Sequence, residues 1–424
     1  MDRKQYKFIE LPASKSIGAR FLVASYFSGS LPAEPYFEDN DDLMVLQQAL
    51  LALYSDEEPI DFGESPIDVN SSGTAFRFVT AVCASTPDAD FVITGTPRLC
   101  SRPMQPLLDV LTQAGAEITP QGPESLGPYR INGKKLEGGE FSIRGDISSQ
   151  FISALMLVAP YWKNGIKLNF TTPVVSRPYI EMTASLLGGF GIDLHITDKY
   201  VLIKNGTYDV PDNFRVEADW SAAAFFYEAV ALGCGEICLR DLLPPGTSLQ
   251  GDSRITEMYR EIGVSSSFNS EGTVLKITES SNPDFVNLDF SDNPDILLPY
   301  ALACLCRGIR FHFSGVKNLR FKESDRIETL RSESLKLGFE LSTGDDYIDW
   351  DGSIGSPQQN IIIDPHDDHR VAMAFAMVAL KTGSITIESP QCVEKSFARF
   401  WDQIPHLGLS CLLKENKMVV TKRI

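Results

Sequence analysis

The sequence contains no apolar run long enough to cross a membrane as a helix. Its longest apolar stretches, such as FISALMLVAPYW, stop well short of the roughly 20 residues that a spanning helix needs. The opening segment MDRKQYKFIE is polar and offers no apolar core for a secretory signal. We therefore expect a soluble protein that works in the cytoplasm.

Cysteine and positive charge are also limited. The eight cysteines form close pairs only in CGEIC and CLC, which fit neither a disulfide framework nor zinc-ribbon spacing. The 38 Lys and Arg residues are outnumbered by 56 Asp and Glu residues, which gives a net charge of -18. So acidic a chain repels nucleic acid and acidic membrane surfaces unless its positive charge is locally concentrated. We expect reduced thiols and no nucleic-acid or membrane partner.

What the sequence does contain is a pattern that recurs about every 60–75 residues. Each copy has a polar opening, an apolar helix rich in alanine, a strand, a loop that usually carries Arg or Lys, and a second helix. Segments such as DFVITG and IRFHFSG predict a strand after each opening. The pattern predicts a mixed α/β module repeated six times, and 424 residues are enough for two domains. The six openings are SKSIGARFLVASYFSG, SSGTAFRFVTAVCA, DISSQFISALMLVAP, ADWSAAAFFYEAVALG, NPDILLPYALACLCRG and HDDHRVAMAFAMVALKTG.

Basic residues accompany the openings and the loops. If the first helices all point the same way, their N-termini collect on one side, each with unpaired N–H groups and about half a positive charge. That side would bind anions. For any single opening, the simpler explanation of its polar residues is that they cap a helix. For any single cation, the simpler explanation is that it is a solvated surface charge. Because polar openings and basic residues recur together from repeat to repeat, we favour an anion site. The cations concerned are Lys15, Arg20, Arg102, Arg177, Lys322, Arg326, Arg370 and Lys395.

Over essentially the whole chain, a series of motifs stands in a familiar order and approximate spacing. The motifs are LPASKSIGAR, SSGTAFR, PRLCSRPM, DISSQF, VSRPYIE, PD at 294–295, KESDRI, DHRVAMA and CVEKSF. In these motifs the chain resembles the 5-enolpyruvylshikimate-3-phosphate synthase family of enolpyruvyl transferases. The resemblance implies a mixed α/β fold of two inverse α/β barrel domains, each of three βαβαββ repeats, with an interdomain cleft. It implies domains at 14–216 and at 1–13 plus 217–424.

The same resemblance implies the reaction. The enolpyruvyl group of phosphoenolpyruvate passes to the 5-hydroxyl of shikimate 3-phosphate by addition and elimination, and phosphate is released on the way to chorismate and the aromatic amino acids. Both substrates carry a carboxylate and a phosphate, which suits a basic cleft in an acidic protein. The resemblance implies no cofactor and no metal, and we expect a monomer.

Residue roles follow from the family pattern. The implied catalytic groups are Asp295 for the 5-hydroxyl proton and Glu323 for the methylene proton, with Lys15 assisting, and which carboxylate acts in which half-reaction stays open. The residues implied to bind shikimate 3-phosphate are Lys15, Ser16, Arg20, Ser148, Ser149, Gln150, Ser176, Tyr179, Asp295, Asn318 and Lys322. The residues implied to bind phosphoenolpyruvate are Lys15, Gly73, Arg102, Gln150, Arg326, Arg370 and Lys395.

The second opening departs from the family pattern, and an acidic segment precedes Arg370. The family usually has Asn-Ala before the Gly-Thr of the second opening, where this chain has Ser71 and Ser72, and we expect a changed contact but retained activity. The segment HDDH at 366–369 has metal-binding residue types without metal-site spacing. We expect Asp367 and Asp368 to cap a helix or to position Arg370, which the resemblance places on the phosphoenolpyruvate carboxylate.

Three alternatives remain. The related UDP-N-acetylglucosamine enolpyruvyl transferase shares the fold, but its opening has a Lys-Asn pair where this chain has Lys15 and Ser16. A catalytically silent homologue would bind the same anions, yet it would not need both Asp295 and Glu323. An RNA-end-processing enzyme with similar repeats is disfavoured by the net charge of -18.

Overall fold

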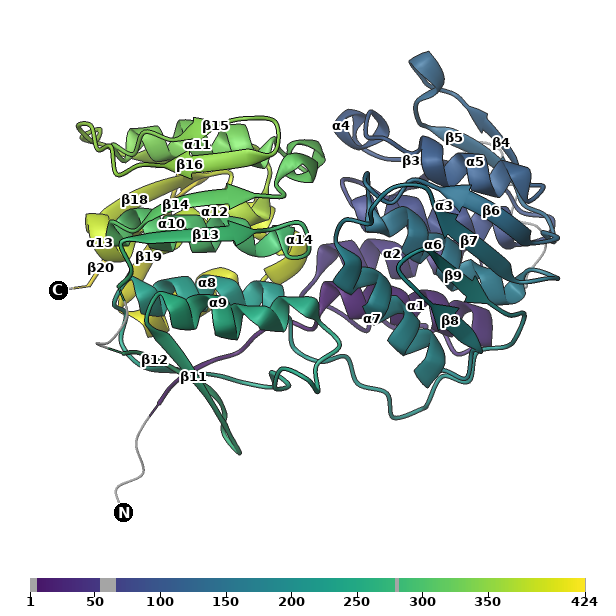
Figure 1. Cartoon of the computed structure of the whole chain (residues 1–424), viewed down its shortest axis with the longest axis horizontal. Coiled ribbons are helices and arrows are strands. Elements are labelled where there is room, and N and C mark those ends of the chain that lie inside the picture. The colour runs from purple at the N-terminus through teal and green to yellow at the C-terminus, as the bar shows by residue number, and fades with distance from the viewer. Residues whose placement is uncertain (1–5, 54–65, 279–281, 424) are drawn as a thin grey trace. The chain divides into compact units, whose positions relative to one another are not determined.

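The computed structural model describes residues 6–53, 66–278 and 282–423 (Figure 1). Contacts divide the chain into two compact units, Lys15–Val216 and Met1–Ser14 with Glu217–Ile424. Sheets of four strands recur in both units with one connectivity. A strand, a buried helix and a parallel strand form a βαβ crossover, and a second helix then leads into an antiparallel hairpin. The mixed α/β module predicted from the repeats is present.

In the unit Lys15–Val216 the helices of the first three openings pack against one another. They are α1 (Lys15–Ser28), α3 (Gly73–Ser85) and α6 (Ser149–Val158). The shorter or more exposed helices are α2 (Asp41–Ala52), α4 (Pro97–Cys100), α5 (Gln105–Gln113) and α7 (Arg177–Gly189). One sheet has the order β2 (Ile67–Asp68), β3 (Asp90–Thr94), β5 (Tyr129–Asn132) and β4 (Glu117–Pro120). The other has the order β6 (Gly139–Ile143), β7 (Ile166–Phe170), β9 (Tyr200–Ile203) and β8 (Leu194–Ile196).

The prediction of a strand after every opening is wrong for the first one. Residues 29–40, which connect α1 to α2, form no strand. Pro32 and Pro35 lie in this connection, and proline cannot donate to a strand ladder. After the other openings the predicted strands are confirmed as β3, β7, β10 (Ile237–Leu239), β14 (Arg310–Ser314) and β18 (Ser384–Glu388).

The second unit has the helices α8 (Trp220–Ala231), α10 (Leu297–Arg307) and α12 (His369–Met377) at its centre. Every residue of α8 and of α12 is buried. A helix covered on all sides needs apolar residues all round, which explains the alanine-rich sequences of these openings. The remaining helices are α9 (Ile255–Glu261), α11 (Arg326–Lys336), α13 (Ala379–Thr382), α14 (Glu394–Phe397) and α15 (Phe400–Gln403).

Three sheets surround these helices. In each, two parallel strands are followed by an antiparallel hairpin. The first has the order β1 (Lys7–Ile9), β10, β12 (Gly272–Ile277) and β11 (Val264–Asn269). The second has the order β13 (Phe285–Asp289), β14, β16 (Tyr347–Trp350) and β15 (Ser342–Thr343). The third has the order β17 (Ile362–Ile363), β18, β20 (Lys417–Lys422) and β19 (Leu409–Lys414).

Strand β1 belongs to the second unit although it precedes the first unit in sequence. It runs parallel to β10, with Lys7 opposite Ile237. Next to it, Ala13 forms an antiparallel bridge with Ala218, and Ser14 N donates to Glu217 O at 2.8 Å. The two places where the chain passes from one unit to the other are therefore hydrogen-bonded together.

Two smaller points concern the helices. Gly115 and Gly338 follow α5 and α11 with φ of 111° and 92°, the left-handed conformation in which glycine commonly ends a helix. Within the described ranges, no helix is both long and apolar enough to span a bilayer.

Candidate active site

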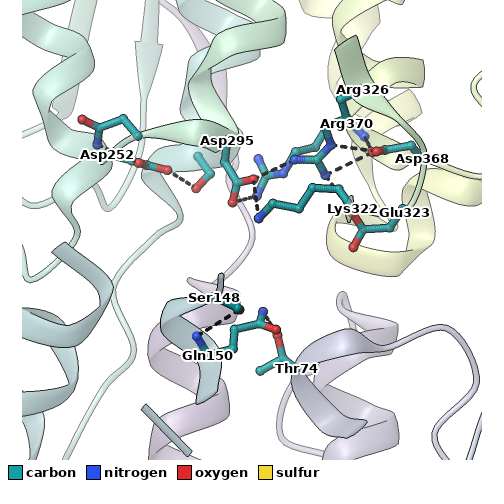
Figure 2. A network of polar contacts seen from close by, with 12 residues as sticks. Thr74, Ser148, Gln150, Asp252, Asp295, Lys322, Glu323, Arg326, Asp368 and Arg370 are labelled. Atoms are coloured by element: carbon teal, nitrogen blue, oxygen red, sulfur yellow. Dashed lines mark hydrogen bonds and ion pairs between the residues drawn. The ribbon is translucent and has the colours of Figure 1, made fainter. Parts of the chain in front are cut away.

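Arg326 joins three carboxylates in the unit Glu217–Ile424 (Figure 2). It opens α11 and is 2% exposed. Its Nε donates to Asp368 Oδ2 at 2.7 Å, its Nη1 to Asp295 Oδ1 at 2.8 Å and its Nη2 to Glu323 Oε2 at 3.0 Å. Burial lowers the pKa of Arg326, but the charges of the three carboxylates outweigh burial and hold that pKa above its usual value. The guanidinium is therefore a permanent cation among acids.

Asp295 lies in the 3-10 turn η5 (Pro294–Ile296) that leads into α10. Its Oδ1 also lies 3.9 Å from Lys322 Nζ, and its Oδ2 accepts from Arg370 Nη2 at 3.1 Å. Glu323 precedes α11, and its Oε1 lies 3.8 Å from Lys395 Nζ. Six residues predicted from the sequence therefore form one cluster of alternating charge, although they come from two repeats: Asp295, Lys322, Glu323, Arg326, Arg370 and Lys395.

Asp368 fixes the start of α12. It is fully buried, and its Oδ1 accepts from the backbone N of Arg370 at 3.0 Å. Its Oδ2 accepts from Ser324 Oγ at 3.2 Å as well as from Arg326. Asp368 thus both caps the helix and positions Arg370, as the sequence led us to expect. Over the described ranges, no group of three or more His, Cys, Asp and Glu residues has metal-site geometry.

Asn318 stands apart from this cluster. It lies in the 3-10 segment η6 (Lys317–Phe321), four residues before Lys322 in sequence. Its Oδ1 is buried and accepts no hydrogen bond from the described residues. An acceptor left in this state is available to a ligand hydroxyl or amide.

The unit Lys15–Val216 carries the other predicted residues at helix starts. Lys15 is the first residue of α1, and its Nζ lies 3.1 Å from Asp42 Oδ2. Ser148 caps α6 by accepting from Gln150 N at 3.3 Å, with Ser149 between them. Gln150 Nε2 donates to Thr74 Oγ1 at 3.0 Å (Figure 2). This bond brings together the N-termini of α6 and α3, as expected for helices that point the same way.

Gly73 begins α3 beneath two guanidinium groups. A Cβ at this position would lie 2.7 Å from Nη1 of Arg102 and 2.7 Å from Nη1 of Arg77. Ser72, one of the two departures from the family pattern, accepts from Ala75 N at 3.3 Å and caps the helix. The position has room for glycine alone unless the arginines move.

Arg20 has a largely internal role. It is 3% exposed, and it donates from Nε to Thr183 Oγ1 at 2.7 Å and from Nη2 to Ser153 Oγ at 2.9 Å. Its Nη1 donates to the backbone oxygen of Ser16 at 2.7 Å. Burial lowers the pKa of Arg20 to about 10. Arg20 therefore connects α1 to α6 and α7. The N-terminal end of α7 also carries two predicted site residues, Ser176 and Tyr179.

Comparison with known proteins identifies the family. The sequence matches the family model for EPSP synthase (3-phosphoshikimate 1-carboxyvinyltransferase) over residues 30–404. The chain belongs to the EPSP synthase family. A 3-phosphoshikimate 1-carboxyvinyltransferase of Bacteroides fragilis is 37% identical over 410 residues, which cover 96% of each chain. One of Photobacterium damsela subsp. piscicida is 31% identical and covers 94% of this chain and 96% of its own.

A solved structure supports the fold independently. EPSP synthase from Acinetobacter baumannii superposes with a TM-score of 0.68 at 22% sequence identity, over 98% of this chain and 97% of that one. Together with the EPSP synthase family match, this likeness confirms the mixed α/β fold of two domains and the resemblance on which it was predicted.

Sequence reasoning missed one buried acid of this EPSP synthase homologue. Asp252, in the 3-10 turn η4 (Gly251–Arg254), is 3% exposed and accepts from Ser221 Oγ and from Asn293 Nδ2 (Figure 2). Burial and the charge of Asp295 raise its pKa to about 6. Its partners are distant in sequence, so no local pattern pointed to it.

Proposed function

We propose that this protein transfers the enolpyruvyl group of phosphoenolpyruvate to the 5-hydroxyl of shikimate 3-phosphate and releases phosphate. The step belongs to chorismate and aromatic amino acid biosynthesis. Membership of the EPSP synthase family and the names of the relatives support the reaction. The observation that carries the proposal is the cluster in which Asp295 and Glu323 both contact Arg326. It combines two acid–base groups with several cations.

The chemistry requires these two kinds of group. In the addition step the 5-hydroxyl oxygen bonds to C2 of phosphoenolpyruvate, the hydroxyl loses its proton and the methylene carbon gains one. In the elimination step the new methyl group loses a proton and the C2–phosphate bond breaks. Asp295 is the proposed group for the hydroxyl proton and Glu323 for the carbon proton, with Lys15 assisting. Asp295 takes the hydroxyl proton in the addition step, whereas Glu323 gives a proton to the methylene carbon in the addition and takes one from the methyl group in the elimination.

The cations supply the binding. Arginine binds carboxylate and phosphate through two parallel hydrogen bonds, and lysine acts as a compact charge. We assign Arg326, Arg370 and Lys395 to phosphoenolpyruvate together with Lys15, Gly73, Arg102 and Gln150. We assign Lys15, Ser16, Arg20, Ser148, Ser149, Gln150, Ser176, Tyr179, Asp295, Asn318 and Lys322 to shikimate 3-phosphate. Substitution of a residue in either set should weaken binding of the substrate to which it is assigned.

The remaining parts of the proposal concern the whole protein. The units Lys15–Val216 and Glu217–Ile424, the latter with β1, are proposed as its two functional domains. We propose that it works as a monomer in the cytoplasm, on small-molecule substrates, without a metal or a cofactor.

The test is phosphate release from phosphoenolpyruvate with one of two acceptors, shikimate 3-phosphate or UDP-N-acetylglucosamine. We expect release with shikimate 3-phosphate alone, and loss of that release in Asp295→Ala and in Glu323→Ala. Release with the UDP-sugar alone would assign the protein to the other enolpyruvyl transfer. Release with neither, in a folded protein that still binds both proposed substrates by calorimetry, would identify a silent homologue.

A further inference from the structure

Asp252 is a buried carboxylate that the proposed mechanism does not use. Its two hydrogen-bond donors stand at the starts of different helices. Ser221 is in the first turn of α8, and Asn293 directly precedes η5, which leads into α10. Asn293 Nδ2 donates to Asp252 Oδ1 at 3.0 Å, and Ser221 Oγ donates to Oδ2. One carboxylate therefore links the N-terminal ends of two core helices.

The backbone of the η5 turn connects Asn293, and through it Asp252, to the proposed base Asp295. Asn293 lies two residues before Asp295, its N donates to Phe290 O at 3.2 Å, and its O accepts from Ile296 N at 3.2 Å. The turn that carries Asp295 is thus closed on itself and tied by the Asn293 side chain to Asp252. Asp252 and Asp295 also interact by charge, since Asp295 raises and Arg370 lowers the pKa of Asp252.

The two residues that precede Gly251 and Asp252 are also held by hydrogen bonds. Gln250, two residues earlier, accepts from Trp220 N at 3.0 Å and donates to Ala218 O at 2.7 Å. Leu249 N donates to Glu217 Oε1 at 2.9 Å. The segment that carries Asp252 is therefore anchored to residues 217–220, where the chain enters α8.

The cations around Asp295 weaken it as a base, and the charge of Asp252 opposes their effect. Asp295 faces Lys322, Arg326 and Arg370 within 3.9 Å. Three cations stabilise a carboxylate and so weaken it as a base. Asp252 contributes a negative charge on the other side of Asp295's turn, in a buried place where charges interact strongly. That charge favours the arrival of a proton on Asp295.

We propose that Asp252 is a positioning residue for Asp295: it fixes the η5 turn through Asn293, and its negative charge strengthens Asp295 as the base for the substrate hydroxyl. The inference rests on the proposed function. Asp252 exchanges no proton with the substrate. It is ionised above about pH 6 and protonated below, so the assistance disappears on the acid side.

The experiment measures kcat from pH 5 to pH 9 at saturating substrates for the wild type and for Asp252→Asn. Asparagine keeps the shape and can still accept from Asn293 through its oxygen, while its NH2 group faces Ser221 as a donor in place of the second acceptor, and the charge is gone. We expect kcat at pH 8 to fall about threefold to tenfold, the effect of weakening a base by up to about one pKa unit. KM for both substrates should change little, because the proposal gives Asp252 no contact with either.

The dependence of kcat on pH distinguishes an effect of the Asp252 charge from purely structural support by its side chain. Substrate phosphates titrate near pH 6 themselves, so the acid limb is compared between variants. In the wild type, protonation of Asp252 should contribute to the fall of kcat on the acid side. We expect that contribution to be absent in Asp252→Asn. A variant with an unchanged kcat at pH 8 and a profile parallel to the wild type would overturn the inference.

Two further variants serve as controls. Ser221→Ala removes a hydrogen bond that lowers the pKa of Asp252, so its acid limb should move to higher pH. Glu228→Gln removes another buried carboxyl group, also on α8, and should leave the profile unchanged. If Asp252→Asn fails to fold, an acid limb at the wild-type position in Ser221→Ala overturns the inference. A wild type inactive with shikimate 3-phosphate would overturn the proposed function instead.

Discussion

Arg370 Nη2 donates to Asp295 Oδ2 at 3.1 Å, although 75 residues separate the two in sequence. Arg326 Nη1 holds the other oxygen of the same carboxylate at 2.8 Å. The proposed base is therefore bound by two of the guanidinium groups that we assign to phosphoenolpyruvate. An anionic substrate that reaches either arginine must share its donors with Asp295 or displace it.

This sharing predicts opposite effects of one substitution on turnover and on binding. In Asp295→Asn the charge that competes for Arg326 and Arg370 is gone, so phosphoenolpyruvate should bind at least as tightly as to the wild type. We expect kcat to fall by about 10²–10⁴, the usual contribution of a general base. Phosphate release and calorimetric titration measure the two effects.

The matched control for this prediction is Asp349→Asn, which removes an aspartate from the outer part of the same unit, where it pairs with His312. It should change neither kcat nor binding. Weaker phosphoenolpyruvate binding by Asp295→Asn would contradict the competition argued above.

Arg326→Met tests the stability of the charged cluster. The substitution would leave Asp368, which is fully buried, without its 2.7 Å donor. Removal of one partner from a buried ion pair costs about 3–5 kcal/mol, so we expect urea unfolding at a clearly lower midpoint as well as loss of activity.

Arg331→Gln is the comparison on the same helix. Arg331 is 41% exposed and pairs with Glu328, and such surface pairs contribute about 0–1 kcal/mol. Equal destabilisation by the two substitutions would show that burial of the Arg326 cluster has no energetic weight.

Gly73→Ala should disturb phosphoenolpyruvate specifically. The new Cβ would fall 2.7 Å from Nη1 of both Arg102 and Arg77, so one or both guanidinium groups must move. A displacement of about 1 Å at a reacting centre can cost up to about 100-fold, and we expect a loss of that order at most in kcat/KM for phosphoenolpyruvate. Gly188→Ala, where a Cβ meets nothing within 4 Å, should behave as the wild type. Unchanged kinetics in Gly73→Ala would remove Gly73 from the site.

Glu228 should make the protein less stable as pH rises. It is fully buried in α8, both oxygens lack hydrogen-bond partners among the described residues, and burial raises its pKa well above the usual value. The folded state then keeps a proton that the unfolded chain loses above about pH 4.3. The folded state binds more protons, so stability falls with pH up to the folded-state pKa.

The substitution Glu228→Gln removes this dependence. We expect the variant to gain on the wild type between pH 5 and pH 8 by up to about 1.4 kcal/mol per pH unit, measured by urea unfolding. Glu257→Gln, on the exposed side of α9, should show no such trend. Curves for Glu228→Gln that run parallel to the wild type would mean that Glu228 ionises alike in both states.

The helices and the charged cluster were accessible from the sequence because their signals are local. A polar residue followed by an alanine-rich run marks a helix start, and Asp368 two residues before Arg370 already indicated a cap. The family motifs then selected Asp295, Glu323 and Arg326. Local signals do not show which residues far apart in the sequence contact each other. Asp252 finds its donors 31 and 41 residues away, and no periodicity encodes such a pair.

Arg20 illustrates the same limit in the other direction. Its motif implies a substrate-binding cation, and nothing local indicates that its Nε and Nη2 also donate to Thr183 and Ser153, 163 and 133 residues away. The motif gives the residue type and the helix start, but only packing decides which donors face inward. Likewise, the repeat predicted a strand after the first opening, but residues 29–40 form none, and two prolines lie there.

The place of β1 sets an order of events during synthesis. Lys7 leaves the ribosome early, but its partner Ile237 is made only after the whole unit Lys15–Val216. At about 5–20 residues per second, β1 waits about 10–50 s for β10. The first unit thus has its entire sequence available while the sheet that begins the second still lacks most of its strands. A nascent chain stalled far enough beyond residue 216 to free the first unit from the ribosome, but before β10, would contain one complete unit and one strand without a partner.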